Sequence, residues 1–271
     1  MPETESELVQ IEWPQPGVAL LRLNRPDRLN ALSTDLVAAI PEALTTVAGD
    51  RACRVIILTG AGRGFCAGLD LHATAGSSDG LGRGPGRMLE GQERFASMIH
   101  TLRSLRQPVI AAVNGPAAGA GFALALGSDI RIAARSARFH VAAVKLGLSG
   151  GECGMSCLLP RYIGAARAFE LLLTGRPFDA DEAERIGLVA RVVADEELID
   201  TALEIAAAVV ANSPLSMWLT KQVVWSNLDA SSFESAIELE NRTQVMASMS
   251  RDSAEAMRAF VEKRPAVFTG E

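Results

Sequence analysis

The sequence predicts an α/β fold followed by a region of helices alone. Up to residue 194, short apolar runs of strand type alternate with helical patterns, as in βαβ units. From Asp195 onward every segment has a helical pattern. The 271 residues, 48% of them hydrophobic, are enough for a substantial core. We therefore divide the chain into a core of residues 1–200 and a helical C-terminal subdomain of residues 201–271.

Several apolar runs in the core are predicted strands. Turn residues end two of them, because Gly60 follows the second run and Asn114-Gly115-Pro116 follows the third. The predicted strands are Val18–Leu23, Val55–Thr59, Val109–Val113, Ile130–Ala133 and Val189–Val193.

The predicted helices show apolar residues at helical spacing. Ser33 is the expected N-cap of the first helix, and Pro41 is expected to kink it. Its apolar side chains are Leu36, Ile40, Leu44 and Val47. The other helices are Glu93–Leu105, Gly121–Leu126, Ala165–Leu172, Glu196–Asn212, Pro214–Leu228, Phe233–Ser248 and Ser253–Lys263. Thr74–Gly86, rich in Gly and Ser, is predicted to be a surface loop that serves as a linker or as a lid.

Composition argues against several classes of protein. The net charge of −6 disfavours a nucleic-acid surface, which usually needs a basic excess. Residues 1–10 are acidic and polar, so we expect no signal peptide, no membrane span and a cytoplasmic protein. We expect free thiols and no metal site, because too few other ligands lie near the cysteines. The cysteines are Cys53, Cys66, Cys153 and Cys157.

The first of two glycine-rich segments runs from Gly60 to Leu71, directly after a predicted strand. Gly62, Gly64 and Ala67 match the G-x-G-x-x-A pattern of dinucleotide-binding folds. That pattern requires a long helix directly after it, but the sequence continues into the loop rich in Gly and Ser. A nucleotide-dependent enzyme is therefore an alternative interpretation only.

The second glycine-rich segment, Asn114–Leu124, ends in a short predicted helix that begins at Gly119–Gly121. Free N–H groups at the start of a helix form a partial positive pole. A thioester oxygen placed there would be stabilised as it became an enolate. Tight packing of the helix on the sheet is the alternative explanation for these small residues.

Together, F-C-A-G-L-D-L at Phe65–Leu71 and N-G-P-A-A-G-A-G-F at Asn114–Phe122 closely resemble the paired oxyanion-hole signature of the crotonase (enoyl-CoA hydratase/isomerase) superfamily. Further stretches between Val18 and Phe268 resemble that family in the same order. They are Asn24–Leu32, Ser128–Ala133, Leu158–Gly164, Ala180–Val189 and Glu262–Pro265. The resemblance implies the family's spiral of ββα units with a helical C-terminal region, assembled as a homotrimer or hexamer.

The resemblance also implies an acyl-CoA thioester as substrate and no separate cofactor, because coenzyme A is part of the substrate. By position, the peptide N–H groups of Leu69 and Ala120 would form the oxyanion hole, each worth roughly 3 kcal/mol. Arg28 and Lys263 would bind the CoA phosphates, Lys263 from a neighbouring subunit. Backbone groups, with Asp70 nearby, would receive the adenine and the pantetheine. These groups belong to Leu29, Ala31, Ala67 and Gly68.

The sequence departs from the hydratases of this family at two positions. The two glutamates that hold a water in those enzymes are replaced by Ala123 and Ala143. Alanine neither takes nor gives a proton, so this route of water addition is not available. Glu152 falls where some family isomerases carry a single acidic base, although an acid there could also stabilise a helix N-terminus. The other candidate bases are Asp70, His72 and His140.

We therefore expect isomerisation of an enoyl-CoA through a stabilised enolate, with Glu152 as the single base. One alternative is an enoyl-CoA hydratase with unusual acid/base residues. Another is a non-catalytic protein that binds CoA thioesters.

Overall fold

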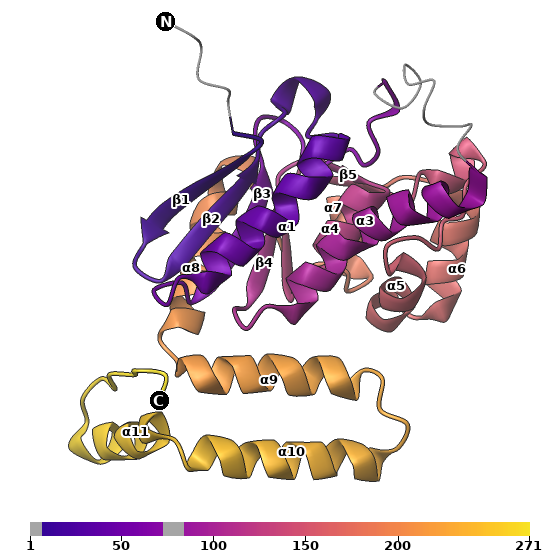
Figure 1. Ribbon diagram of the computed structural model, residues 1–271. Helices are drawn as coiled ribbons and strands as arrows, with labels where there is room; N and C mark the ends of the chain where they lie inside the picture. Colours follow the sequence, from indigo (N-terminus) through magenta and orange to yellow (C-terminus); the bar gives the residue numbers. More distant parts are fainter. Residues whose placement is uncertain (1–6, 73–83) are drawn as a thin grey trace, which may run out of the picture.

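The computed structural model describes residues 7–72 and 84–271 (Figure 1). At its centre is a six-stranded sheet of order β1-β2-β3-β4-β6-β9. In this sheet β1 is antiparallel to β2, and the other neighbouring strands are parallel. The strands are β1 (Val9–Gln15), β2 (Val18–Leu23), β3 (Val55–Gly60), β4 (Val109–Val113), β6 (Ile130–Ala134) and β9 (Arg191–Val193).

Helices cover both faces of the central sheet, which explains why its middle strands are unbroken apolar runs. Val18 and Leu20 of β2 pack with α8 (Leu198–Val210) on one face. Ala19 and Leu21, which alternate with them, lie in the main core on the other face. The helices that contribute to that main core include α1 (Thr34–Gly49), α3 (Gly84–Ser104) and α4 (Ala120–Gly127).

A second, three-stranded sheet of order β5-β7-β8 packs beside α4. Its strands are β5 (Pro116–Ala118), β7 (Arg138–His140) and β8 (Phe178–Asp179). The ring of Phe122 on α4 lies 5.4 Å from that of Phe139 and 6.0 Å from that of Phe178, measured between centroids. These buried contacts fix α4 against the small sheet. The helices α5 (Met155–Ile163), α6 (Ala165–Thr174) and α7 (Ala180–Arg185) complete this part of the chain.

The strands predicted from apolar runs are all confirmed, although β9 begins at Arg191 instead of Val189. The strands β1, β5, β7 and β8 do not follow from the apolar pattern. The last three are only two or three residues long, and β1 is mostly exposed.

The first predicted helix is confirmed as α1, which Ser33 caps with its side chain and which continues through Pro41. The helix expected from Glu93 begins at residue 84, so the end of the predicted loop is helical instead. Residues 74–83 of that loop lie outside the described residues. The C-terminal helices follow the predicted pattern closely, as α9 (Pro214–Asn227), α10 (Phe233–Ser248) and α11 (Arg251–Glu262).

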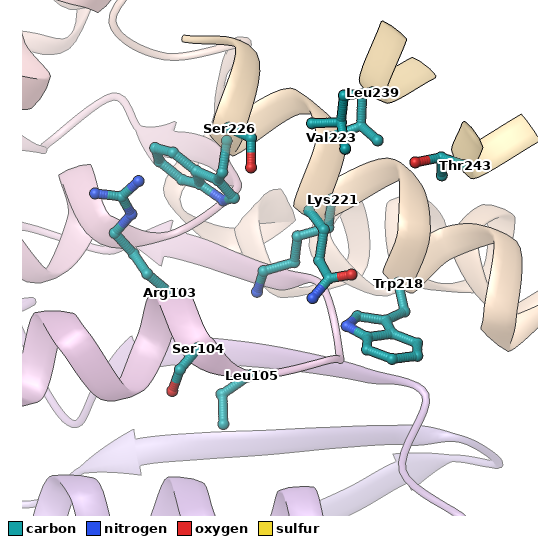
Figure 2. A pocket seen from close by; sticks show the side chains of 11 residues that line it. Arg103, Ser104, Leu105, Trp218, Lys221, Val223, Ser226, Leu239 and Thr243 are labelled. Carbon is teal, nitrogen blue, oxygen red and sulfur yellow. The ribbon is translucent and has the colours of Figure 1, made fainter. Parts of the chain in front are cut away.

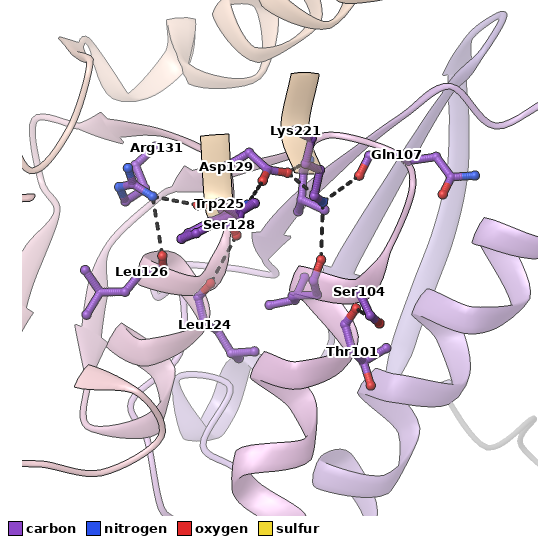
Figure 3. A network of polar contacts seen from close by, with 12 residues as sticks. Thr101, Ser104, Gln107, Leu124, Leu126, Ser128, Asp129, Arg131, Lys221 and Trp225 are labelled. Carbon is purple, nitrogen blue, oxygen red and sulfur yellow. Dashed lines mark hydrogen bonds and ion pairs between the residues drawn. The ribbon is translucent and has the colours of Figure 1, made fainter. Parts of the chain in front are cut away.

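The first of these C-terminal helices, α9, is attached to the core by a buried ion pair (Figure 3). Nζ of Lys221 lies 2.8 Å from Oδ2 of Asp129 and donates to the Gln107 carbonyl at 2.9 Å. Trp225, about one turn further along α9, donates its indole N–H to Oδ1 of Asp129 at 2.7 Å. The position of α9 is therefore fixed by polar contacts with the residue that precedes β6.

The helices α10 and α11 lie away from the sheet, on the far side of α9 (Figure 1). Several large apolar side chains of these two helices and of the turn between them are exposed to solvent, which is typical of an interaction surface. They are Phe233, Val245, Met246, Met249, Met257, Phe260 and Val261.

Within residues 7–72 and 84–271, no single helix is long and apolar enough to span a membrane. The segments Asp195–Val210 and Pro214–Asn227 meet the same criteria only as a pair bent by 107°.

Candidate active site

The two glycine-rich segments lie side by side in the structure. The N–H of Cys66 donates to the carbonyl of Pro116 at 3.0 Å, and the N–H of Ala118 donates to the carbonyl of Cys66 at 2.9 Å. Gly68 has a φ of +80°, and a Cβ atom on it would lie 2.5 Å from the carbonyl oxygen of Ala118. Glycine is therefore required for this close approach. The same Cβ position lies 3.6 Å from Cα of Gly119, so residues 68 and 119 are in contact.

The N–H of Leu69 has no acceptor within the described part of the chain. The backbone groups on either side of it are hydrogen-bonded. The carbonyl of Gly68 accepts from the Leu32 N–H at 2.7 Å. The N–H of Asp70 in turn donates to the Leu32 carbonyl at 3.2 Å. This pairing holds the segment in place and leaves the Leu69 N–H available to a ligand.

Ala120 supplies the second N–H group, at the start of α4, where a helix leaves its first N–H groups unpaired. Gly119 before it has φ 50° and ψ −127°, a conformation that favours glycine. The N–H of Gly119 donates to the His140 carbonyl at 3.0 Å, and its own carbonyl accepts from the Ala123 N–H at 3.0 Å. The N–H and the carbonyl of Gly119 are thus both hydrogen-bonded, which fixes the peptide unit that carries the Ala120 N–H.

The Glu152 carboxylate lies against Gly119. A Cβ atom on Gly119 would be 3.4 Å from Oε1 of Glu152, which places the carboxylate beside the residue that precedes Ala120. Burial raises the pKa of Glu152, and the side-chain amide of Gln92 opposes that shift. A carboxyl group with a raised pKa is suited to take up a proton and to return it. The structure therefore brings together all three residues predicted for catalysis.

The two positions at which family hydratases carry glutamates lie in the protein interior. Ala123 is fully buried in α4, and Ala143 is 4% exposed. Neither position offers a group that can bind or activate water.

Of the other candidate bases, His140 and Asp70 have side chains engaged in contacts of their own. Nε2 of the His140 ring lies 2.8 Å from the carbonyl oxygen of Gly175. The carboxylate of Asp70 is 5% exposed and pairs with Arg25, with 2.9 Å between Nη2 and Oδ2. His72 is exposed, and its backbone N–H donates to Oδ1 of Asp70 at 3.2 Å.

The residues predicted to receive the adenine and the pantetheine meet on one stretch of backbone. The N–H of Ala67 donates to the carbonyl of Leu29 at 2.9 Å, in line with the contact between Leu32 and Gly68. Arg28 is exposed at the edge of this region, at the end of a short 3-10 turn. The structure thus brings together Arg28, Leu29, Ala31, Ala67, Gly68 and Asp70.

Asn30 and Arg25, to which no role was assigned from the sequence, hold this stretch together. Asn30 is fully buried with a φ of 56°. Its side chain accepts from the Arg25 N–H at 2.8 Å and donates to the carbonyls of Ala61 at 3.0 Å and Gly64 at 2.7 Å. The stretch Asn24–Leu32, which was noted for its resemblance to the family, contains both residues, so the signal was present in the sequence.

Lys263 lies far from these residues within one chain. It follows α11 in a left-handed conformation, with a φ of 54°. The helix α11 and the start of α1, which follows the predicted CoA-binding residues, are at opposite ends of the molecule (Figure 1). A role for Lys263 from a neighbouring subunit stays a prediction.

A separate cavity of about 370 Å³ lies between the end of α3 and the helices α9 and α10 (Figure 2). Its basic side chains have structural partners, because Lys221 pairs with Asp129 and Arg103 lies 4.1 Å from the centre of the Trp225 ring. Among the described residues, no Asp, Glu or His lines this cavity. It therefore lacks the acid/base group that the site near Glu152 has.

The described ranges contain no group of three or more His, Cys, Asp or Glu residues that could hold a metal ion. The cysteines are free, with Cys53, Cys66 and Cys153 buried and Cys157 exposed.

Comparison with known proteins assigns the chain to a family. The family model for enoyl-CoA hydratase/isomerase matches residues 14–271. The chain belongs to the enoyl-CoA hydratase/isomerase family of the crotonase superfamily. This confirms the resemblance seen in the two glycine-rich segments, and it favours that interpretation over the nucleotide-binding alternative. In agreement, residues 61–70 form turns and isolated β-bridges instead of the long helix that a dinucleotide site requires.

Similar proteins in this family are named either as hydratases or as isomerases. The chain is 46% identical to a probable enoyl-CoA hydratase of Mycobacterium tuberculosis, over 97% of this chain and 93% of that one. It is 42% identical to the 1,2-epoxyphenylacetyl-CoA isomerase of Escherichia coli, over 94% and 96%. The crystal structure of a monofunctional enoyl-CoA isomerase from Mycobacterium smegmatis matches with 44% identity and a TM-score of 0.74, over 86% and 99%. The family acts on acyl-CoA thioesters, and its names alone do not decide between hydration and isomerisation.

Proposed function

We propose that this enzyme isomerises an enoyl-CoA thioester, moving a double bond from C3–C4 to C2–C3, with Glu152 as its single acid/base residue. The observation that carries the proposal is the contact between the Glu152 carboxylate and Gly119, beside the Ala120 N–H. The alanines at positions 123 and 143 support it, because isomerisation does not need the water-holding glutamates that they replace.

The reaction requires one proton to move along the substrate. The ionised Glu152 takes a proton from C2, and the electrons move onto the thioester oxygen to give a dienolate. The N–H groups of Leu69 and Ala120 stabilise that oxygen, by roughly 3 kcal/mol each. The protonated Glu152 then gives the proton to C4, the carbonyl re-forms, and the double bond ends between C2 and C3. No group is added or lost, so one carboxyl group is sufficient.

For the CoA moiety, the proposal assigns the phosphates to Arg28, which is exposed at the edge of the site. The adenine and the pantetheine would bind along the backbone of the adjoining stretch, which the Arg25–Asp70 ion pair and Asn30 hold in shape. The backbone groups are those of Leu29, Ala31, Ala67 and Gly68. Lys263 would reach this site from a neighbouring subunit of a homotrimer or hexamer, in which residues 201–271 would bury their exposed apolar side chains.

The similarity to the M. tuberculosis protein named as a probable hydratase favours a second candidate, a hydratase with unusual acid/base residues. In that case Glu152 would have to activate the water without the usual partner, since Ala123 and Ala143 have no acidic group. The similar enoyl-CoA isomerase of M. smegmatis favours the first candidate.

The test compares isomerisation of a 3-enoyl-CoA with hydration of a 2-enoyl-CoA by the wild type and by Glu152→Gln. We expect isomerisation to fall by about 10²- to 10⁴-fold in the variant, with ligand binding retained in calorimetry. Glu93→Gln is the matched control, because Glu93 is exposed on α3. Hydration that survives in Glu152→Gln would contradict the assignment of Glu152. Tight binding of a CoA thioester without any turnover by the wild type would identify a binding protein instead.

A further inference from the structure

We infer that Gln92 is a positioning residue for this reaction, because its hydrogen bond to Cys153 holds the turn that carries Glu152. The inference rests on the proposed role of Glu152. Gln92 belongs to α3, and Glu152 and Cys153 precede α5, so the hydrogen bond from Gln92 to Cys153 joins α3 to the turn before α5.

The geometry begins with the turn after Glu152. Cys153 has a φ of 49° and Gly154 a φ of 81°, so two successive residues are left-handed. The first is not glycine, and such a conformation persists only where the surroundings hold it. Nε2 of Gln92 lies 3.6 Å from Sγ of Cys153 and donates a hydrogen bond to it. The N–H of Met155 closes the turn on the Glu152 carbonyl at 2.8 Å.

The thiol of Cys153 adds no charge beside Glu152. Cys153 is 6% exposed, and its burial raises the pKa of the thiol to about 12, so it stays protonated at neutral pH. Its sulfur therefore serves as a neutral acceptor for the amide of Gln92. That contact places the amide beside the residue that follows Glu152.

The amide of Gln92 is the favourable polar neighbour of that carboxylate. Burial favours the neutral form of Glu152, and the Gln92 amide acts in the opposite direction. In the described ranges, no charged side chain of α3, α4 or α5 shifts the pKa of Glu152 further. A base must be ionised before it takes the C2 proton. Removal of the amide therefore lowers the fraction of enzyme in which Glu152 is ionised at a given pH.

The test measures the pH profile of kcat/KM for 3-enoyl-CoA isomerisation in Gln92→Ala and Gln92→Glu. We expect the rising limb to move to higher pH in Gln92→Ala and further in Gln92→Glu, where a like charge is added. Below the limb, kcat/KM of Gln92→Ala should fall about three- to tenfold, with the change in kcat rather than in KM. Glu93→Ala, the neighbouring exposed position on α3, is the control and should leave the limb unchanged.

Two outcomes would overturn the inference. One is a limb that stays in place in both Gln92 variants. The other is a loss of rate that is equal at every pH, which would mean that Gln92 only supports the fold. The carboxyl titration of Glu152, followed by NMR of labelled glutamate in wild type, Gln92→Ala and Glu152→Gln, gives a readout that does not depend on turnover. If Glu152→Gln retains full isomerisation, the proposed function fails. If only the Gln92 variants show no shift, the inference alone fails.

Discussion

Gly119 presents its Cα directly to the Glu152 carboxylate, with 3.4 Å between Oε1 and the position of an added Cβ. Gly119 also has φ 50° and ψ −127°, where a side chain is strained by about 1–3 kcal/mol. We expect Gly119→Ala to lower kcat by about 100-fold, because a small shift of this peptide misplaces the Ala120 N–H relative to the base. Steady-state kinetics and thermal unfolding should be measured together. Gly164→Ala is the control, since Gly164 has a φ of +81° in open space and should lose stability without losing kcat.

The raised pKa of Glu152 predicts how stability depends on pH. Its folded-state pKa lies above the ordinary value, so the native state binds a proton more readily than the unfolded state. Stability is therefore lost as the pH rises from the unfolded pKa through the folded pKa. We expect Glu152→Gln to have a higher Tm than the wild type at pH 7.5 and a similar Tm at pH 4, where both side chains are neutral. A lower Tm for the variant at pH 7.5 would contradict this.

The middle strands could be predicted because both of their faces are buried, which makes their sequences continuous apolar runs. The first strand could not, because β1 has one buried residue, mostly exposed neighbours and Pro14 within it. The small sheet was missed because β7 and β8 are too short for any alternation to show.

The backbone part of the site could be predicted because it depends on glycines and on a helix start, both of which leave a local pattern in the sequence. The Gln92 contact has no such pattern. Gln92 is an ordinary polar residue on the exposed part of an amphipathic helix, and its partner Cys153 is 61 positions away. Only the packing of α3 near α4 and α5 brings the two together.

The ion pair between Lys221 and Asp129 should contribute strongly to stability, because 5% and 16% of their side-chain surfaces are exposed. Lys221→Met leaves a poorly solvated carboxylate without its cation, which costs about 3–5 kcal/mol. Urea unfolding should show this loss, and Lys145→Met, at an exposed lysine, should not. In Lys221→Met/Asp129→Asn the loss should be smaller than in Lys221→Met alone, since no charge is left unpaired. Equal losses in the single and double variants would show that the ion pair is not the cause.

The exposed side chains of α11 should mediate assembly. Phe260 is 84% exposed and Val261 is 79% exposed, which is unusual for residues of this type unless a partner covers them. Light scattering of the wild type should give three times the 28.7 kDa of one chain, or a multiple of that. Phe260→Asp should dissociate the assembly, whereas Phe260→Leu should keep it. A wild type that is monomeric at working concentration would contradict the prediction.

The distance of Lys263 from the candidate site of its own chain predicts a shared site between subunits. Lys263→Met should raise KM by about fivefold or more, because it removes one charge from a phosphate contact, and kcat should change little. Mixing Lys263→Met with Glu152→Gln under conditions of subunit exchange should then recover sites that have both native residues. In such a site, the chain with Lys263→Met supplies Glu152 and its neighbour supplies Lys263. The measurement is the appearance of turnover with the KM of the wild type on mixing. If each chain used its own Lys263, no pairing of these two variants could form a native site, and the KM would stay at the value of Lys263→Met.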